Sequence, residues 1–397
     1  MKKIKKEVSN KKFSTIEVIF LVVITCLVSL YFGTKITYKE SNKDEFLSEI
    51  EKVYKEIKTN YYTDVNKDDL LSGAINGMTS ALDKYSTLID SSSNENFYLT
   101  LEGSYSGVGI EISSDNDNNI FIIGVLSNSP AEKAGLKAGD IIKKIDNVDL
   151  SNKDYKYVSE YIRKNSNKTD YKIEILRDGE TLNFDLKKDT VMIKSVSSKI
   201  IEKEDKKIGY IYISIFSNTT ASQFKKELDN LQKNGISSLI IDVRENTGGH
   251  LTTAVGILSE LLSSENVIYQ IEKNSKKSKF YSLGKKNFEY PIAIIQNGDS
   301  ASASEMLAIS LKENLNAIII GETSYGKGTV QELNYLSNGD TYKYTTKKWL
   351  SPKGKWIEGK GIVPDFEVKL NEEYINNPTD ENDNQLQTAI NEILKKM

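Results

Sequence analysis

A serine-rich turn and a lysine between two glycines are the residues best suited to chemistry in this sequence. Residues 300–305 read S-A-S-A-S-E, and Lys327 lies between Gly326 and Gly328. A serine hydroxyl is a weak nucleophile until a neighbouring base takes its proton. A lysine can act as that base only when its amine is neutral, which burial favours by lowering the pKa from about 10.4 toward roughly 7–8. The two segments therefore predict nucleophilic catalysis by a serine with a lysine base.

The elements around the serines predict a strand, a turn and a helix. The apolar run 292–295 ends at Asn297-Gly298, as a buried strand entering a turn would. From Ala303 onward, apolar or small residues recur at the spacing of a helix packed on a sheet. The serines then lie at the helix N-terminus, where unpaired backbone amides and the helix dipole favour developing negative charge. Ser302 and Glu305 also fit an ordinary capping box that involves no chemistry.

A second buried strand, 317–321, precedes the loop that carries Lys327. If Thr329 begins the next strand, the alternation of side chains puts Lys327 and Gln331 on one face, where the Gln331 amide can orient the amine. The alternative for Lys327 alone is a surface lysine, since the chain is rich in lysine.

The chain has one histidine, His250, and one cysteine, Cys26. A Ser-His-Asp protease would have to use His250, and a zinc site with two histidines is impossible. An intramolecular disulfide and a cysteine-rich metal site are excluded as well. This scarcity favours a lysine as the base for any serine nucleophile.

S-A-S-A-S-E followed by G-E-T-S-Y-G-K-G-T-V-Q resembles the signature of the C-terminal processing peptidases, also called tail-specific proteases. The resemblance implies a serine endopeptidase with Ser302 as nucleophile, Lys327 as general base and Gln331 as the support of the lysine. It covers roughly residues 45–370. Three positions depart from the family pattern: Tyr325, where phenylalanine is usual, and Lys84 and Thr247, where proline is usual.

A glycine-containing loop follows the predicted strand 238–243. Residues 242–249 read D-V-R-E-N-T-G-G and resemble the family's D-x-R-x-N-x-G-G loop, with Thr247 where proline is common. The resemblance implies an oxyanion hole built from the backbone amides of Gly248 and Ala303, with Gly249 as a further candidate donor.

Residues 101–186 are identified as a PDZ domain. The segment 129–142, S-P-A-E-K-A-G-L-K-A-G-D-I-I, is a strong match, and Asp178-Gly179 predicts a hairpin turn between two alternating strands. In such a domain a peptide adds to a sheet edge while backbone amides hold its terminal carboxylate. The carboxylate-binding loop expected here consists of four residues: Gly107, Val108, Gly109 and Ile110.

The N-terminal sequence predicts membrane targeting. Six lysines lie within the first twelve residues, and the apolar run 18–32 follows. This pattern favours an uncleaved anchor with the lysines in the cytoplasm and the catalytic domain on the extracytoplasmic side. Secretion after removal of a signal peptide is the alternative.

The predicted fold class is an α+β multidomain protein with a layered α/β peptidase core of the crotonase/ClpP-like kind. No metal or organic cofactor is required, and the net charge of −3 gives no reason to expect nucleic acid. The resemblance implies homodimers and protein or peptide substrates with exposed C-terminal tails or loops. The expected segments are a cytoplasmic tail and transmembrane anchor at 1–35, a helical region at 36–100, the PDZ domain at 101–190, the peptidase core at 191–372, and a linker with a helix at 373–397.

Two alternatives belong to other functional classes. The first is a non-catalytic PDZ adaptor whose protease-like domain only binds, which the presence of Ser302, Lys327 and Gln331 together disfavours. The second uses the same layered fold for acyl-CoA chemistry, against which the predicted anchor and PDZ domain argue.

Overall fold

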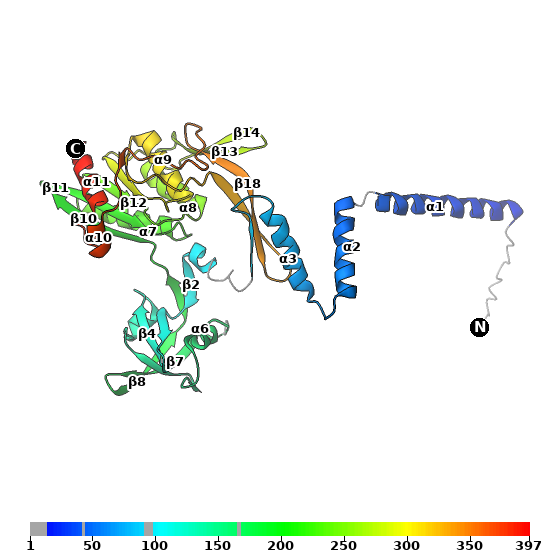
Figure 1. Ribbon diagram of the computed structural model, residues 1–397, viewed down its shortest axis with the longest axis horizontal. Helices are drawn as coiled ribbons and strands as arrows, with labels where there is room; N and C mark the ends of the chain where they lie inside the picture. The colour runs from blue at the N-terminus through cyan, green and yellow to red at the C-terminus, as the bar shows by residue number, and fades with distance from the viewer. Residues whose placement is uncertain (1–13, 42–43, 91–97, 165–167) are drawn as a thin grey trace, which may run out of the picture. The chain divides into compact units, whose positions relative to one another are not determined.

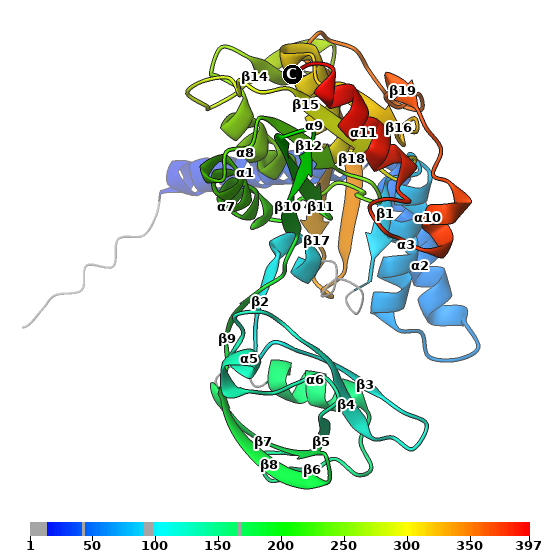
Figure 2. The ribbon, with the colours of Figure 1, turned by 90° about the vertical axis from the view of Figure 1, so that its left-hand side faces the viewer.

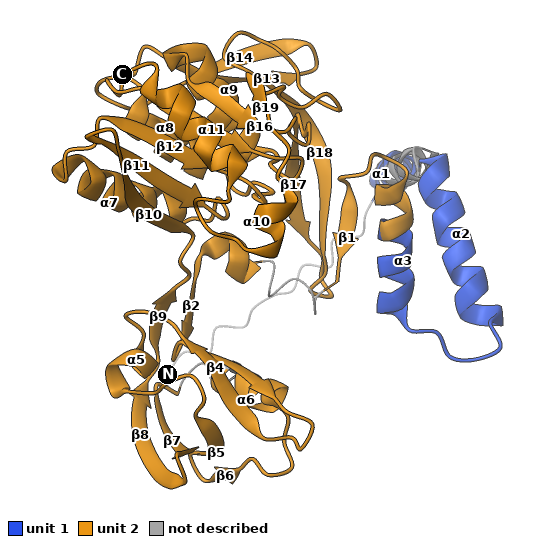
Figure 3. Ribbon diagram, turned by 60° about the vertical axis from the view of Figure 1, so that its left-hand side comes forward, with its two compact units in different colours: residues 1–75 blue, residues 76–397 orange. Residues whose placement is uncertain are grey.

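The computed structural model describes residues 14–41, 44–90, 98–164 and 168–397 (Figure 1). The chain divides into two compact units, residues 1–75 and 76–397 (Figure 3), and helix α3 (Lys67–Ser80) crosses the division. The lysine-rich segment of the first twelve residues lies outside the described part.

The first unit is helical. It contains α1 (Thr15–Ser41) and α2 (Glu45–Asn60), and the Asp44 carboxylate caps α2 by accepting the Phe46 amide at 3.1 Å. Within the described ranges, no helix combines the length and apolar character needed to cross a bilayer. The transmembrane anchor predicted from residues 1–35 therefore finds no support in the structure.

A six-stranded sheet forms the centre of the second unit. Its order is β10-β11-β12-β15-β16-β19, and every neighbouring pair is parallel except β10 with β11. The strands are β10 (Val196–Lys203), β11 (Lys206–Ile213), β12 (Ser238–Asp242), β15 (Ile292–Gln296), β16 (Ile318–Gly321) and β19 (Phe366–Glu367). Continuous apolar runs form these strands because helices cover both faces of a parallel sheet.

Successive strand residues alternate between two apolar cores. Ile241, Ile294 and Ile319 face a cluster with α7 (Thr220–Lys233), α8 (Leu251–Leu261) and α9 (Ala303–Leu315). Ile240, Ile295 and Ile320 pack with α11 (Asn384–Leu394) on the other face (Figure 2). Each fully buried isoleucine stabilises the fold by roughly 1.5–3 kcal/mol, so this double burial fixes the strand register. The layered α/β core expected from the sequence is present.

A second sheet contains β17, the strand that directly follows the Lys327 loop. Its path is β1-β18-β13-β14, and β17 pairs with β18. The strands are β1 (Thr87–Ile89), β13 (Val267–Lys273), β14 (Lys276–Tyr281), β17 (Thr329–Tyr335) and β18 (Thr341–Leu350). The short helix α10 (Glu372–Asn376) precedes α11.

The PDZ region has its own sheet and apolar core. Its strands are β3 (Ile110–Ser114), β4 (Ile120–Val125), β5 (Ile141–Ile145), β6 (Val148–Asp149), β7 (Asp170–Arg177) and β8 (Glu180–Lys187), with helices α5 (Pro130–Ala134) and α6 (Tyr155–Lys164). The predicted hairpin turn is confirmed: Asp178 and Gly179 have φ of 52° and 84°, and Arg177 pairs with Glu180. The paired strands β2 (Ser104–Gly107) and β9 (Asp189–Met192) flank this region in the sequence (Figure 2).

Candidate functional site

Ser302 lies at the N-terminus of α9, directly after the turn that follows β15. Its backbone has φ 56° and ψ −109°, a conformation that non-glycine residues rarely adopt. Such strain persists only where the surroundings hold it, and it clusters at active sites. The residue is 8% exposed. The sequence prediction that this serine begins a helix is confirmed.

The neighbouring serines are bound to the backbone of the glycine-containing loop. The Ser300 hydroxyl donates to the Val243 carbonyl at 2.7 Å, and the Ser304 hydroxyl donates to the Asn246 carbonyl at 2.8 Å. Within the described part of the chain, the Ser302 hydroxyl has no hydrogen-bond partner. Of the three serines, only Ser302 has a hydroxyl without a hydrogen bond to another described residue.

Glu305 joins the serine segment to the lysine loop. Its side chain is fully buried and accepts hydrogen bonds from the Ser302 amide at 2.8 Å, the Ser324 hydroxyl at 2.6 Å, and the amides of Gly326 and Lys327 at 2.6 and 2.9 Å. Burial raises the pKa of this carboxyl, and these hydrogen bonds oppose the rise. Sequence analysis recognised Glu305 only as part of a capping box, because its contacts with residues 324–327 depend on tertiary structure.

The backbone of the Lys327 loop is enclosed by residues 356–361. A Cβ at Gly326 would lie 2.7 Å from the Gly361 nitrogen, and a Cβ at Gly328 would lie 2.7 Å from the Trp356 ring nitrogen. The Trp349 indole donates to the Lys327 carbonyl at 2.8 Å. The flanking glycines are thus required by close packing.

The Lys327 amine has the electrostatic surroundings that a base needs. Burial lowers its pKa below the ordinary lysine value, and the positive charge of Lys343 lowers it further. Carboxylates of Glu358, Glu305 and Asp83 act in the opposite direction. A larger fraction of neutral amine is therefore available than in an exposed lysine.

The predicted contact between Gln331 and Lys327 is not formed. The Gln331 amide nitrogen donates to the hydroxyls of Thr329 and Thr345, at 3.0 and 3.1 Å. A register shift between Val330 and Gln331 interrupts the pairing of β17 with β18. A bulge breaks the alternation of side chains between the two faces of a strand. The prediction that Lys327 and Gln331 lie on one face therefore fails. Among the described residues, the Lys327 amine forms no hydrogen bond with Gln331 or Ser302.

Gly248 contacts the Ser302 segment closely. A Cβ at Gly248, whose φ is 102°, would lie 2.8 Å from the Ala301 carbonyl oxygen and 2.9 Å from the Ser302 Cβ. The Gly248 amide itself donates to the Asn246 side-chain oxygen at 2.9 Å. In this conformation the Gly248 amide already donates to a side chain. The predicted oxyanion hole instead requires this amide to donate to a substrate.

Gly249 and Ala303 are the other two residues predicted for the oxyanion hole. Gly249 has φ 139° and bridges to Phe216, through hydrogen bonds made by the adjacent Gly248 carbonyl and His250 amide. Ala303 is the first residue of α9 and is fully buried. Both amides lie where unpaired donors are expected, at a helix start and in a glycine loop.

A buried ion-pair network holds the glycine loop to the C-terminal helix region. Arg244 donates from Nε and Nη2 to the Asp242 carboxylate, and from Nη1 and Nη2 to the Asp383 carboxylate. Tyr210 donates to Asp242 at 2.7 Å. These charges are mutually satisfied, so removing one partner would leave an uncompensated buried charge.

The predicted catalytic residues line one cleft of about 740 Å³. Ser302, Lys327, Gln331, Gly248 and Gly249 all contribute to its walls. Lys343 and His250 also line it, together with Thr100, Leu101, Ile215, Thr247, Leu251, Thr252, Thr329, Val330 and Leu333. Sequence analysis missed Lys343, which lies in an alternating strand of ordinary composition.

His250 contributes no base in this conformation. Its Nε2 atom is buried and has no hydrogen-bond partner in the residues that the structure describes. The Ser302 hydroxyl is therefore not activated by this histidine.

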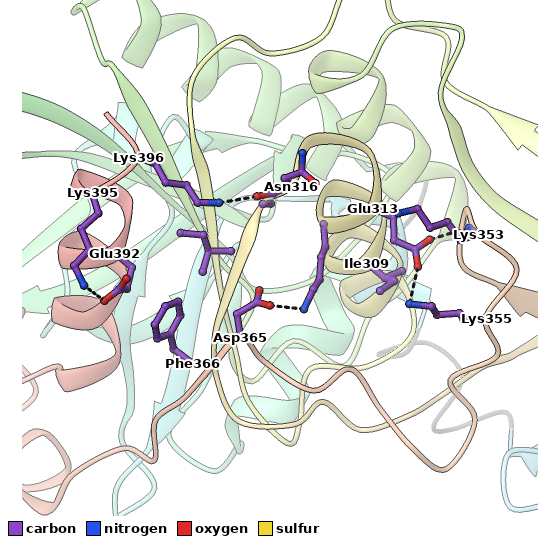
Figure 4. A pocket seen from close by; sticks show the side chains of 13 residues that line it. Ile309, Glu313, Asn316, Lys353, Lys355, Asp365, Phe366, Glu392, Lys395 and Lys396 are labelled. Atoms are coloured by element: carbon purple, nitrogen blue, oxygen red, sulfur yellow. Dashed lines mark hydrogen bonds and ion pairs between the residues drawn. The ribbon is translucent and has the colours of Figure 1, made fainter.

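A second pocket, of about 520 Å³, lies at the far end of α9 (Figure 4). Its lysines are largely bound to neighbouring groups: Lys312 to Asp365 at 2.8 Å, Lys395 to Glu392 at 2.5 Å, and Lys396 to the Asn316 carbonyl at 3.0 Å. It contains no predicted catalytic residue. The predicted catalytic residues therefore lie in the larger cleft and not in this pocket.

The predicted peptide-binding loop leads into β3, an edge strand of the PDZ sheet. Gly107, Val108 and Gly109 are buried, and Ile110 is half-buried. A Cβ at Gly109, whose φ is 81°, would lie 2.2 Å from the Ser129 Cβ. The glycine is thus required by packing, and the edge of β3 has the geometry that strand addition needs.

Two of the departures from the family pattern, Lys84 and Tyr325, lie against each other. The Lys84 amine is 4.9 Å from the centroid of the Tyr325 ring and 4.9 Å from that of the Tyr85 ring. An ammonium group is attracted to an aromatic face at this distance. The chain thus pairs an unusual lysine with an unusual tyrosine, a contact that separate motif comparisons could not reveal.

No group of three or more metal-binding side chains is assembled in the described residues. The geometry offers a serine hydroxyl, a lysine amine of lowered pKa and glycine amides around one cleft. This arrangement can support acyl transfer to a serine.

Comparison with known families gives three matches along the chain. The model of peptidase family S41 matches residues 207–368, a PDZ domain model matches 106–187, and the model of the activating protease CtpB N-terminal domain matches 31–93.

Two relatives from Bacillus subtilis (strain 168) extend over most of the chain. The carboxy-terminal processing protease CtpB is 37% identical over 333 residues, which cover 83% of this chain and 69% of the relative. The carboxy-terminal processing protease CtpA is 33% identical over 366 residues, which cover 89% and 78%. A solved structure of a putative S41 protease from Bacteroides fragilis has the same fold, with a TM-score of 0.50 and 16% identity over 85% of this chain and 92% of that one.

Proposed function

This chain belongs to the carboxy-terminal processing proteases of peptidase family S41, and we propose that it cleaves proteins with Ser302 as nucleophile and Lys327 as general base. It is a serine peptidase that carries a PDZ domain. The observation that supports the dyad most is that Ser302 and Lys327 line one cleft together with the glycine loop.

In the proposed mechanism, the neutral Lys327 amine takes the proton of the Ser302 hydroxyl as the oxygen attacks the scissile carbonyl. The amides of Ala303 and of the glycine loop stabilise the oxyanion, aided by the N-terminus of α9. Lys327 then protonates the leaving amine, and a water activated by the same group hydrolyses the acyl-enzyme. The α9 cap, which places Ser302 beside these amides, supports this assignment.

Productive chemistry requires side-chain movement in this cleft. The Lys327 amine must reach Ser302, and the Gly248 amide must exchange its bond to Asn246 for the substrate oxyanion if it is to contribute. Gln331 must leave its two threonine partners before it can support the lysine. We propose that substrate binding drives these changes.

A peptide-cleavage assay with three variants tests the dyad. Ser302→Ala and Lys327→Ala should each abolish hydrolysis of a peptide or an unfolded protein, while Ser304→Ala should retain most of it. Loss with both dyad variants supports the mechanism and rules out a non-catalytic PDZ adaptor. Undiminished cleavage by Ser302→Ala would refute the assignment.

We propose that the PDZ domain selects exposed C-terminal tails or loops by strand addition at the β3 edge. The buried glycines of the preceding loop support this role because they bring backbone amides close to the edge. Removal of residues 101–186 should alter substrate choice or regulation. Identical cleavage of every tested substrate after this removal would contradict it.

The cellular location is a separate proposal from the sequence. The lysine-rich start and the apolar run 18–32 favour a catalytic domain on the extracytoplasmic side. A fusion of a location-sensitive reporter to the C-terminus should be active only outside the cytoplasm. Reporter activity in the cytoplasm would contradict this location.

We also propose that the chain forms homodimers. Phe46, Ile50 and Val53 recur at helical spacing, so an apolar stripe runs along α2. Light scattering should give twice the monomer mass, and Val53→Glu should reduce it. A monomeric wild-type protein would refute the proposal.

A further inference from the structure

The amine of Lys327 lies over an aromatic ring from a distant part of the sequence. Its Nζ atom is 5.2 Å from the centroid of the Tyr85 ring. Neither the Ser302 hydroxyl nor the Gln331 amide forms a hydrogen bond with this amine in the described residues. In this conformation the base therefore faces Tyr85, which the proposed mechanism does not use.

Tyr85 is bound to the loop that carries the base. Its hydroxyl donates to one oxygen of Glu358 at 3.0 Å, and the other oxygen of Glu358 accepts the Gly328 amide at 2.8 Å. Burial raises the pKa of Tyr85 to about 12, so the hydroxyl remains a donor at neutral pH. The ring and the backbone beside Lys327 thus share one carboxylate, which fixes their relative position.

The chain around Tyr85 is held independently. The Asp83 carboxylate accepts the amides of Tyr85 and Ser86 at 2.9 and 3.0 Å. The Ser86 hydroxyl accepts the Thr345 amide at 3.2 Å, and β1 then pairs with β18. The position of the ring is therefore determined by the sheet as well as by Glu358.

An aromatic face attracts an ammonium group much more strongly than a neutral amine, because the attraction is electrostatic. The Tyr85 ring consequently favours the protonated form of Lys327. Catalysis requires the neutral form. The ring therefore stabilises the protonated amine, whereas the proposed base function requires the neutral amine.

We propose that Tyr85 is a positioning residue that holds the protonated Lys327 amine away from Ser302, so that the amine engages the serine only after it loses its proton and leaves the ring. This inference rests on the proposed role of Lys327 as the base. The contact with the Tyr85 ring then sets the pH above which the neutral Lys327 amine is available to Ser302.

Several charged groups also face Lys327, and they come from four elements. Lys343 comes from β18, Glu358 from the loop after β18, Glu305 from α9, and Asp83 from the segment before β1. The Lys84 amine faces the same Tyr85 ring at 4.9 Å. A change of Tyr85 to leucine removes the aromatic face but leaves all of these charges in place and retains apolar volume.

The test compares Tyr85→Leu and Tyr85→Phe with the wild type in the full-length protein. The pH profile of kcat/KM is measured with a peptide substrate. The pKa of Lys327 is measured separately, from the pH dependence of trace acetylation by acetic anhydride followed by mass spectrometry. Tyr85→Leu should move both midpoints down by roughly 0.5–1 pH unit. Tyr85→Phe should leave both near the wild-type values because it keeps the ring.

Unchanged midpoints in Tyr85→Leu, or equal shifts in the two variants, would overturn the inference. A purely structural role predicts lower kcat and lower thermal stability with fixed midpoints. Tyr85→Met provides a second non-aromatic variant if the leucine protein does not fold. Lys327→Ala separates the two claims: retained hydrolysis refutes the proposed dyad, whereas the acetylation midpoints in the Tyr85 variants still report on the ring contact.

Discussion

The proposed nucleophile and the proposed base of this cleft are held in different ways. Ser302 is fixed through its backbone, by an uncommon φ of 56°, by the start of α9 and by the bond from its amide to Glu305. The backbone of Lys327 is fixed equally well, by Glu305 and Trp349. Its amine, however, lies over Tyr85 and forms no hydrogen bond with Ser302 in the described residues.

This difference suggests how the site can be both stable and regulated. Backbone positions that depend on buried hydrogen bonds are costly to change, by roughly 1–3 kcal/mol for each unsatisfied group. A side chain on a flexible stem changes rotamer at much lower free energy. We therefore expect activation to move the Lys327 side chain while the backbone of both segments remains in place.

The largest effect is expected when the base cannot lose its proton. Lys327→Arg keeps the positive charge and the approximate length but cannot be neutral at any usable pH. kcat/KM should fall by about 10³-fold or more at every pH. The control is Lys348→Arg, because Lys348 also lies over an aromatic ring, that of Trp356, at 4.3 Å. Substantial activity in Lys327→Arg would mean that another group is the base.

Gly248→Ala tests whether the backbone position of Ser302 determines activity. The new Cβ would lie within 3 Å of the Ala301 carbonyl and the Ser302 Cβ, so the nucleophile segment must shift. Activity should fall by roughly 10²-fold, as misplacement of about 1 Å often causes. Gly235→Ala is the matched control, since Gly235 also has positive φ (79°) but has open space around its Cβ position. Equal activities in a steady-state assay would contradict this reasoning.

Glu305→Gln tests the link between the two segments. The amide can accept with only one oxygen, so part of the set of four donors loses its partner. We expect a loss of about 2–4 kcal/mol in the free energy of unfolding and about a tenfold drop in activity. Denaturant titration and initial rates measure the two.

Glu313→Gln is the control for this prediction. Glu313 lies on the same helix, is nearly buried, and accepts the Lys353 amide at 2.7 Å far from the cleft. It should lower stability without lowering the activity of the folded protein. Similar activity losses in both variants would show that Glu305 has no special role in positioning.

The smallest expected effect is a shift in the pH profile of kcat/KM when Lys343 is replaced. The positive charge of Lys343 lowers the pKa of Lys327, so Lys343→Met should raise that pKa. A higher pKa means that the neutral base appears only at higher pH, and the acidic limb of kcat/KM should move up by about half a pH unit. Lys347→Met, on the same strand and paired with Glu332 at 2.7 Å, should leave the limb unchanged. A downward shift in Lys343→Met would contradict the assigned sign.

The sequence predicted the elements of the peptidase core closely, because long apolar runs and glycine turns are local signals. The predicted strands 238–243 and 292–295 correspond to β12 and β15. The predicted strand 317–321 begins at Ile318 and ends at Gly321. Strand and helix ends depend on the last backbone hydrogen bonds, which apolar periodicity does not specify.

The site could be predicted less completely. Ser302, Lys327 and the glycines were recognised because motifs and backbone conformation are encoded locally. The orientation of Gln331 was not, since a bulge at Val330 and Gln331 changes which way the side chain points. Glu305, Lys343 and Tyr85 were missed as parts of the site because their roles arise from tertiary contacts.

Identification of the acyl-enzyme would show which residue is the nucleophile. The full-length protein would react with a slowly hydrolysed peptide ester, and the adduct would be quenched in acid and located by mass spectrometry of fragments. We expect one acyl group on Ser302 in the wild type, and none in Ser302→Ala or Lys327→Ala. An adduct on Ser300, Ser304 or any other residue would contradict this expectation.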